Sequence, residues 1–340
     1  MVESVATTLL NVENLTVRFA VKRGGGFSKK HFLYAVDDVS FAIRRGETLA
    51  IVGESGSGKT TAALAVARLV DAYQGRVNLD GHDILNLQGE GLRKARTKVQ
   101  FIFQDPYSSL NPRQRAEDIV CEPLDSLSNK QPAEKKAIVD RLFKAVGLRP
   151  EQQRLFPHQF SGGQRQRIGI ARALATQPEL IICDEPVSAL DVAVQAQILN
   201  LLRRLQKDFG LTYLFISHDL GVVQHMCDGV AVMYMGKIVE HADRLSLFNN
   251  PLHPYTAALL SAVPTVDKTM REQTRRILIP GDPPDPVNLP KGCRFANRCP
   301  VAQDQCRAAE PVLKTVGNGH RIACHLVDDG TTSPLAQLQK

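Results

Sequence analysis

Gly53-Glu54-Ser55-Gly56-Ser57-Gly58-Lys59-Thr60 is the stretch of sequence from which the fold can be read. It matches the pattern GxxxxGK followed by Ser or Thr, whose glycines let backbone N–H groups converge on phosphate oxygens. A lysine at position 59 can reach the β- and γ-phosphates of a nucleotide, and a hydroxyl at position 60 can bind Mg²⁺. We therefore expect residues 53–60 and the adjoining Thr61 to form a phosphate-binding loop.

The neighbouring sequence has the order that such a loop requires. The apolar run Leu49-Ala50-Ile51-Val52 precedes it, and residues 60–70 are rich in Ala and Leu, as in a helix. A helix that starts at the loop would point its positive end at the same phosphates. The alternative is a glycine-rich turn without a ligand, but a chance match is expected in only about one in a hundred chains of this length.

Further short apolar runs indicate an α/β fold with a mainly parallel sheet. They lie at residues 99–103, 180–183 and 213–216 and are separated by helical patterns. One helical pattern places apolar residues at 198, 201, 202 and 205, and Gly210 is positioned to end that helix. Buried strands that alternate with helices are typical of parallel sheets.

The regions around this core have a different character. Residues 9–50 alternate apolar and polar positions, which favours strands, whereas residues 112–176 contain no convincing strand and are predicted to be helical. Apolar residues at 230, 232 and 234, followed by the turn Met235-Gly236-Lys237, predict an antiparallel hairpin. After about residue 250 the composition changes, and residues 280–290 hold five prolines, as in a linker or an extended wrap.

Composition and charge exclude several classes of protein. The 340 residues are 43% hydrophobic, so most of the chain is not disordered, and no run approaches 18 apolar residues. No Lys or Arg precedes Arg18, unlike a secretory signal, which places the chain in the cytosol. The net charge of +7 is compatible with an anionic partner or simply with a basic solvated surface.

A second part of the phosphate site is expected where the apolar run 180–183 ends. Asp184 and Glu185 follow that run directly. A carboxylate at this place can hold Mg²⁺, directly or through water, and the next carboxylate can polarise an attacking water molecule. Buried strands often end in acidic residues, so this pair gains its meaning from the phosphate loop beside it.

Four further motifs together resemble the ATP-binding cassette (ABC) ATPases over about residues 9–265. Ser161-Gly162-Gly163-Gln164 is similar to the signature motif of that family, although Phe160 stands where many members have Leu. Gln104 resembles the Q-loop glutamine, residues 188–191 resemble the D-loop, and His218 resembles the switch histidine. The resemblance implies a RecA-like parallel core sheet with an N-terminal antiparallel β subdomain and a helical insertion.

The resemblance also implies a mechanism. Glu185 would be the general base, His218 would contact the γ-phosphate of ATP, and Gln104 would sense Mg²⁺ and water. Thr60, Gln104 and Asp184 would hold the Mg²⁺ ion. The signature residues would close on ATP bound to a second cassette, so an obligate pair of cassettes is expected. An aromatic residue stacks on the adenine in this family; Phe27 is favoured here, with Phe32 and Tyr34 as alternatives.

Longer segments narrow the resemblance to the ATPases of bacterial dipeptide and oligopeptide importers, and among them to the "F" type of dipeptide subunit. These segments are residues 103–113, 184–202 and 250–264. The resemblance implies an ATP-hydrolysing motor at the cytoplasmic face of the inner membrane. Its partners would be a second ATPase subunit, two permeases and an extracytoplasmic peptide-binding protein.

Other functions stay open at this point. Nickel and murein-peptide importers share much of the pattern, and the cassette does not encode the direction of transport. A soluble ABC ATPase that acts on nucleic acid or ribosomes is disfavoured because the chain holds one cassette and no long coiled-coil pattern. We therefore expect no nucleic-acid partner.

Four of the seven cysteines, Cys293, Cys299, Cys306 and Cys324, lie in the last 50 residues. No CxxC pair is present, so the usual zinc-ribbon and ferredoxin spacings fail, and chemistry alone leaves a metal site and inert buried thiols both open. The resemblance implies a 4Fe–4S cluster on these four cysteines. We expect a nucleotide-binding domain over residues 9–250, with a helical subdomain at about 105–176. An extension over residues 251–330 and a flexible tail over 331–340 would complete the chain.

Overall fold

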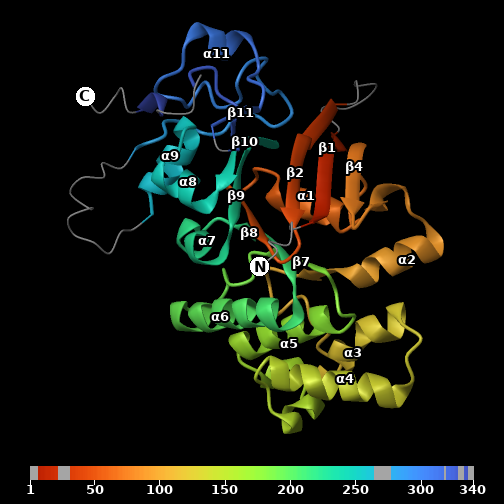
Figure 1. Cartoon of the computed structure of the whole chain (residues 1–340). Helices are drawn as coiled ribbons and strands as arrows, with labels where there is room; N and C mark the ends of the chain where they lie inside the picture. Colours follow the sequence, from red (N-terminus) through yellow and green to blue (C-terminus); the bar gives the residue numbers. More distant parts are fainter. Residues whose placement is uncertain (1–6, 22–30, 264–276, 318, 328–332, 336–340) are drawn as a thin grey trace, which may run out of the picture.

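The computed structural model describes residues 7–21, 31–263, 277–317, 319–327 and 333–335. Figure 1 shows helices α3 to α6 gathered at one end of the molecule and the C-terminal region, with α11 and β11, at the other. Two sheets lie between them. The α/β fold predicted from the sequence is therefore confirmed, and it includes both a mainly parallel sheet and an antiparallel one.

The main sheet has the strand order β11-β12-β10-β9-β3-β8-β7-β6. The neighbours from β9 to β6 are parallel, and β10, β12 and β11 extend the sheet in antiparallel fashion. The strands are β3 (Thr48–Val52), β6 (Val99–Ile102), β7 (Leu180–Asp184), β8 (Thr212–Ser217), β9 (Gly229–Tyr234), β10 (Lys237–Asp243), β11 (Lys314–Val316) and β12 (His320–Ile322). The predicted hairpin is the β9–β10 pair.

The second sheet is antiparallel and has the order β2-β1-β4-β5. Its strands are β1 (Thr8–Val21), β2 (His31–Arg44), β4 (Gln74–Leu79) and β5 (His82–Asp83). Figure 1 shows β1, β2 and β4 beside the main sheet, and α1 contacts strands of both sheets.

The helices separate into those around the main sheet and those of the predicted helical region. The first group is α1 (Lys59–Val66), α2 (Gly89–Lys98), α6 (Val192–Phe209), α7 (Leu220–Met226), α8 (Arg244–Asn249), α9 (Pro254–Ser261) and α11 (Asp304–Ala308). The second group is α3 (Ala116–Leu127), α4 (Pro132–Ala145) and α5 (Gly162–Leu174), and residues 112–176 contain no strand. Short 3-10 turns lie at Ile84–Asn86, Pro150–Arg154 and Pro157–Gln159. None of the helices of the described residues is long and apolar enough to cross a bilayer.

Alternation along the central strands creates two hydrophobic cores. In β3, Ala50 and Val52 pack into a core shared with α5 and α6, whereas Leu49 and Ile51 pack into a core shared with α1 and the antiparallel sheet. All five residues of β3 are buried because both faces of the strand are covered. The phosphate loop follows directly, so the packing on both faces fixes where it begins.

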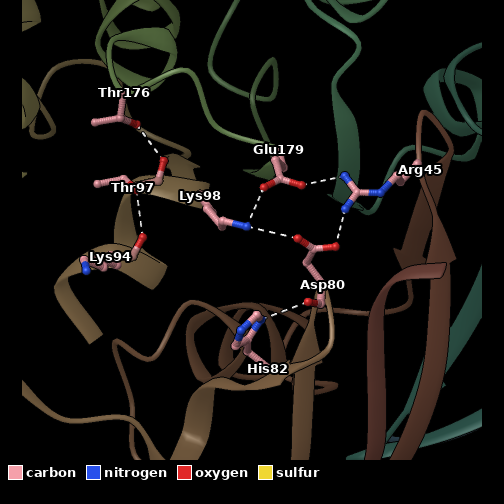
Figure 2. A network of polar contacts seen from close by, with 8 residues as sticks. All are labelled: Arg45, Asp80, His82, Lys94, Thr97, Lys98, Thr176 and Glu179. Carbon is pink, nitrogen blue, oxygen red and sulfur yellow. Dashed lines mark hydrogen bonds and ion pairs between the residues drawn. The ribbon is translucent and has the colours of Figure 1, made fainter. Parts of the chain in front are cut away.

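A ring of four charges joins the two sheets at the amino ends of the parallel strands. Arg45 contacts Asp80 and Glu179, and Lys98 contacts the same two carboxylates, with Nζ 3.0 Å from Asp80 Oδ2 and 2.8 Å from Glu179 Oε1 (Figure 2). Signs alternate around the ring, so every neighbour is attractive. The pKa of the Asp80 carboxyl is held below its usual range by hydrogen bonds from Lys98 and Arg45. The ring fastens the antiparallel sheet at the end opposite to the phosphate loop.

Candidate functional site

The phosphate loop lies between the end of β3 and the start of α1, pressed against other backbone. A Cβ atom on Gly53 would lie 2.1 Å from the carbonyl oxygen of Met233, and one on Gly58 would lie 2.0 Å from that of Ala35. Both glycines also have positive φ values, +152° and +102°. Only glycine suits these two positions, because any side chain would collide with a neighbouring strand.

Lys59 is buried with its ammonium group turned back onto the loop. Its Nζ donates to the carbonyl oxygens of Gly53 and Glu54, each at 2.8 Å. Burial lowers the pKa of Lys59, while the nearby carboxylates of Glu185 and Asp184 act in the opposite direction. The Lys59 ammonium is therefore paired with two neutral carbonyl groups, and the negatively charged phosphates of a nucleotide would bind it more strongly.

Thr60 and Asp184 bring together two oxygen atoms suited to a hard cation. Thr60 Oγ1 donates to Asp184 Oδ1 at 3.1 Å, and Asp184 is 5% exposed at the carboxyl end of β7. Burial raises the pKa of Asp184, and the Thr60 hydrogen bond opposes that rise. Because Mg²⁺ prefers oxygen ligands and keeps several waters, a hydroxyl and the carboxylate bonded to it are a suitable donor pair.

Glu185 is held between Gln104 and His218. Gln104 Nε2 donates to Glu185 Oε2 at 3.0 Å, and His218 Nδ1 lies 3.0 Å from Glu185 Oε1. Glu185 has a φ of 46°, so its backbone is in the left-handed region. The three residues follow β7, β6 and β8, whose carboxyl ends meet at the same edge of the sheet.

One cavity of about 760 Å³ connects these groups. That volume is ordinary for a small-molecule site, for which about 300–1,000 Å³ is usual. The lining residues are Phe19, Leu33, Tyr34, Ala35, Ser55, Gly56, Gly58, Lys59, Thr60, Thr61, Gln104, Glu185, His218, Met235, Gly236 and Pro286. The structure therefore brings the predicted phosphate loop and the three predicted catalytic residues to one place.

Several apolar residues also line this cavity. Phe27, favoured from the sequence for the adenine, lies outside the described residues. Of the two alternatives, Tyr34 lines the cavity. The Phe32 ring instead packs against Arg18, whose guanidinium carbon lies 4.2 Å from the ring centre. Pro286, from the proline-rich stretch for which the sequence left a linker and an extended wrap open, also lines the cavity.

Residues 161–164 lie apart from this cavity, at the start of α5. Ser161 is exposed and caps the helix by accepting a hydrogen bond from the Gln164 N–H at 3.3 Å. None of the four lines the cavity. A Cβ on Gly163 would lie 2.5 Å from Val194 Cγ1, so α6 packs closely behind the turn. The open side of the turn faces outward with a helix N-terminus, which suits an anion brought by another molecule.

The four tail cysteines share one small cavity. Cys293, Cys299, Cys306 and Cys324 line it together with His253 and Phe295. Burial raises the pKa of Cys293 to about 11 and of Cys324 to about 12. Among the described residues, no group of three or more His, Cys, Asp or Glu is placed to hold a single metal ion. The sulfurs therefore surround a common space without meeting at one point.

Comparisons with known proteins agree with this architecture. Residues 36–188 match the family described as "ABC transporter", and residues 239–306 match "Oligopeptide/dipeptide transporter, C-terminal region". The chain is 49% identical to the oligopeptide transport ATP-binding protein AppF of Bacillus subtilis, over 94% of this chain and 97% of that protein. The chain belongs to the ABC transporter family.

Other members of the ABC transporter family extend this result. The putative oligopeptide transport ATP-binding protein YkfD of Bacillus subtilis is 47% identical over 95% of this chain and 97% of its own length. The ATP-binding cassette MJ0796, solved as a dimer in a post-hydrolysis state with ADP and Pi, has a TM-score of 0.61 and 29% identity. That comparison covers 69% of this chain and 99% of the solved chain.

A second solved ABC protein, cbiO1 from Clostridium perfringens, gives a TM-score of 0.61 at 28% identity and covers 71% of this chain and 91% of that chain. The predicted ABC fold is therefore confirmed. The family match to the cassette ends at residue 188, so His218 lies beyond it, and the match to the C-terminal region ends at Cys306, before Cys324. The roles of the individual site residues stay predictions.

Proposed function

We propose that this chain is the ATP-hydrolysing motor subunit of a peptide importer. The observation that carries the proposal is the convergence of Lys59, Thr60, Glu185 and His218 around one cavity, with Asp184 hydrogen-bonded to Thr60. The peptide substrate is supported by the names of the similar proteins and by the match of residues 239–306. Peptide, nickel and murein-peptide transporters would share the motor, so the partners decide the solute.

We propose a role for each group at this cavity. Lys59 exchanges its two carbonyl contacts for the β- and γ-phosphates of ATP. Thr60 and Asp184, with Gln104, would hold Mg²⁺, which would neutralise the charge that develops on the transferred phosphoryl group. Glu185 accepts the proton of the attacking water molecule. Each carboxylate oxygen of Glu185 has one partner, Gln104 or His218, and keeps a second lone pair that can accept a hydrogen bond from the water molecule.

A second cassette is needed to complete the site. The signature turn at residues 161–164 is exposed at Ser161, half-buried at the other three residues, and does not line the chain's own cavity. We propose that it closes on ATP held by a partner ATPase, whose own signature turn covers the cavity described here, in a heterodimer. Two permease subunits would provide the path through the membrane, and a peptide-binding protein would deliver the solute. The pair would sit at the cytoplasmic face of the inner membrane.

The proposed division of the chain is a cassette over residues 9–250, with its helical subdomain at about 105–176, and an extension over residues 251–330. Of the proposed tail at 331–340, the structure describes only residues 333–335. We propose that Cys293, Cys299, Cys306 and Cys324 hold a 4Fe–4S cluster. A zinc ion would need all four sulfurs at about 2.3 Å from one point. In a four-iron cluster each sulfur binds a different iron atom, so sulfurs that surround a shared space are suitable.

The cluster has a direct test. Protein purified without oxygen should contain about four iron and four acid-labile sulfide per chain. Cys306→Ser should lower both, whereas Cys121→Ser, which changes a cysteine of the helical region, should leave both unchanged. Iron-free protein from anaerobic cells would refute the cluster.

The motor assignment is tested by isolating the closed assembly. A tagged Glu185→Gln chain is incubated with Mg-ATP, extracted from membranes of its own host, and its partners are identified by mass spectrometry. The expected partners are a second cassette, two permeases and a peptide-type binding protein. If a nickel-type or murein-peptide-type binding protein is found instead, the proposed substrate changes from peptides to that solute. Ribosomal proteins or nucleic acid without a permease would overturn the importer.

A further inference from the structure

The phosphate loop is held from behind by residues of the C-terminal region. The backbone N–H of Glu54, the second residue of the loop, donates to Tyr255 Oη at 2.8 Å. The Glu54 carboxylate accepts from Arg298 Nη1 at 2.8 Å and from Arg298 Nη2 at 3.3 Å, in a two-point arrangement. The sequence separations are 201 and 244 residues. Glu54 is therefore bound by the C-terminal region through both its backbone and its side chain.

The two partners of Glu54 are shielded from water, whereas the Glu54 side chain itself is 31% exposed. Tyr255 is fully buried, and Arg298 is 7% exposed. Arg298 Nη1 also donates to Tyr234 Oη at 3.3 Å, and the rings of Tyr234 and Tyr255 pack with centres 4.7 Å apart. An ion pair with two-point geometry in such a place is oriented closely, and loss of one partner leaves the other charge without a match.

The grip reaches Lys59 through a single peptide unit. The Glu54 N–H and the Gly53 carbonyl belong to the same planar peptide group and point in opposite directions. On one side the Glu54 N–H donates to Tyr255 Oη, and on the other side the Gly53 carbonyl accepts from Lys59 Nζ. Rotation of this plane would break both hydrogen bonds. Tyr255 thus orients the Gly53 carbonyl, which is one of the two carbonyl groups that hold the Lys59 ammonium before a nucleotide binds.

The same part of the tail carries the cysteine cavity. Arg298 directly precedes Cys299, and Arg294 directly follows Cys293. Arg294 is bonded to Asp37 and to the Met235 carbonyl, so a second buried arginine fixes the other end of this segment on the cassette. The short segment from 293 to 299 therefore links two cavity-lining cysteines to the phosphate loop.

We propose that Tyr255 and Arg298 are positioning residues of the nucleotide site, through which the C-terminal extension sets the affinity of the phosphate loop for ATP. This proposal rests on the proposed function of the cavity. Because coupling between two sites is reciprocal, bound nucleotide must in turn tighten the segment around Cys299.

The test measures Mg-ATP affinity on the full chain, purified without oxygen, with a fluorescent ATP analogue. Arg298→Gln and Tyr255→Phe are each expected to weaken binding by about tenfold, within the range typical of coupled sites. Arg298→Lys should recover part of that loss because it keeps the charge but not the two-point geometry. Glu310→Gln is the control, since Glu310 ties the tail to Lys237 and Arg294 without touching the loop.

Two further readouts separate positioning from a general loss of structure. Glu54→Gln combined with Arg298→Gln should weaken binding no more than either change alone, because both remove the same contact. In the unchanged chain Mg-ATP should slow alkylation of Cys299 in samples stripped of iron, and this protection should vanish in Arg298→Gln. Thermal unfolding of each variant checks that the fold is kept.

The outcomes also separate this proposal from the function on which it rests. If Lys59→Ala abolishes binding while Arg298→Gln and Tyr255→Phe bind like the unchanged chain, the positioning role is refuted and the nucleotide site stands. If Lys59→Ala binds as tightly as the unchanged chain, the site itself is wrong. Equal losses in Glu310→Gln and Arg298→Gln would also overturn the proposal, since any tail contact would then have the same effect.

Discussion

Replacement of Glu185 by Gln should stop ATP turnover while ATP binding is kept. The change is nearly isosteric and removes one negative charge and the ability to accept a proton. Gln104 can still donate to the side-chain oxygen of the new residue, because only one of the two oxygens is lost. The new amide group can donate to His218 Nδ1, which lies 3.0 Å from the other position. The arrangement of the three side chains should therefore survive.

The magnitudes differ between the three measurable quantities. General-base catalysis contributes about 10²–10⁴-fold, and a 10³-fold loss corresponds to about 4 kcal/mol in the barrier. The free energy of unfolding should fall by only about 1 kcal/mol, since one charge-assisted hydrogen bond becomes neutral. Binding of ATP should stay equal or become tighter, because a negative charge near the phosphates is removed.

The assay follows phosphate release by the purified transporter complex, together with ATP affinity and chemical unfolding of the full chain. Glu179→Gln is the matched control: Glu179 lies directly before β7 and Glu185 directly after it, so the two carboxylates sit at opposite ends of one strand. The control should keep its turnover. If Glu185→Gln retained more than about a tenth of the turnover, the assignment of the general base would be refuted.

Three other predictions concern stability. Gly58→Ala should lower the free energy of unfolding by about 3 kcal/mol or more, since a left-handed residue costs about 1–2 kcal/mol and its Cβ meets a carbonyl oxygen. Gly46→Ala is the control: Gly46 has a φ of +76°, but a Cβ there would have no atom within 4 Å, so only the backbone cost is expected. Asp80→Asn should cost about 1 kcal/mol in low salt and less in 1 M salt, because its partners are partly exposed; an equal cost at both salt concentrations would contradict the charge ring. Burial lowers the pKa of His241 to about 4, so the unfolded chain binds a proton that the folded chain does not between about pH 6.5 and 4. The free energy of unfolding should therefore fall across this interval, by up to about 3 kcal/mol from this residue, and less steeply in His241→Gln.

Features with a local physical cause were predictable from the sequence. The apolar runs 49–52, 180–183 and 213–216 mark strands that are covered on both faces and so carry no polar alternation. Gly210 ends α6 with a φ of 65°, as its position in the sequence indicated. The helix expected over residues 60–70 is shorter, because α1 ends at Val66 and Arg68 adopts a left-handed φ of 56°.

Contacts between residues far apart in the chain produce no recognisable local pattern in the sequence. Strands β11 and β12 have three residues each, too few for a recognisable period, yet they extend the main sheet through β10. Tyr255 and Arg298 were not predicted for the site because no local pattern indicates a contact with Glu54 more than 200 residues away. Gln104 and His218 were predicted only because their order along the chain matched a known set of motifs, whereas Glu185 was also indicated by the apolar run that it follows.

The grip on Glu54 also has a consequence for the time at which the site is completed. A ribosome produces the phosphate loop early, but the guanidinium that holds it belongs to residue 298 of 340. Until that residue leaves the ribosome exit tunnel, the phosphate loop of the nascent cassette lacks the contact between Glu54 and Arg298. A chain truncated before the cysteine segment would therefore end its synthesis with an incompletely held loop, so a fault at the end of translation would affect the nucleotide site itself.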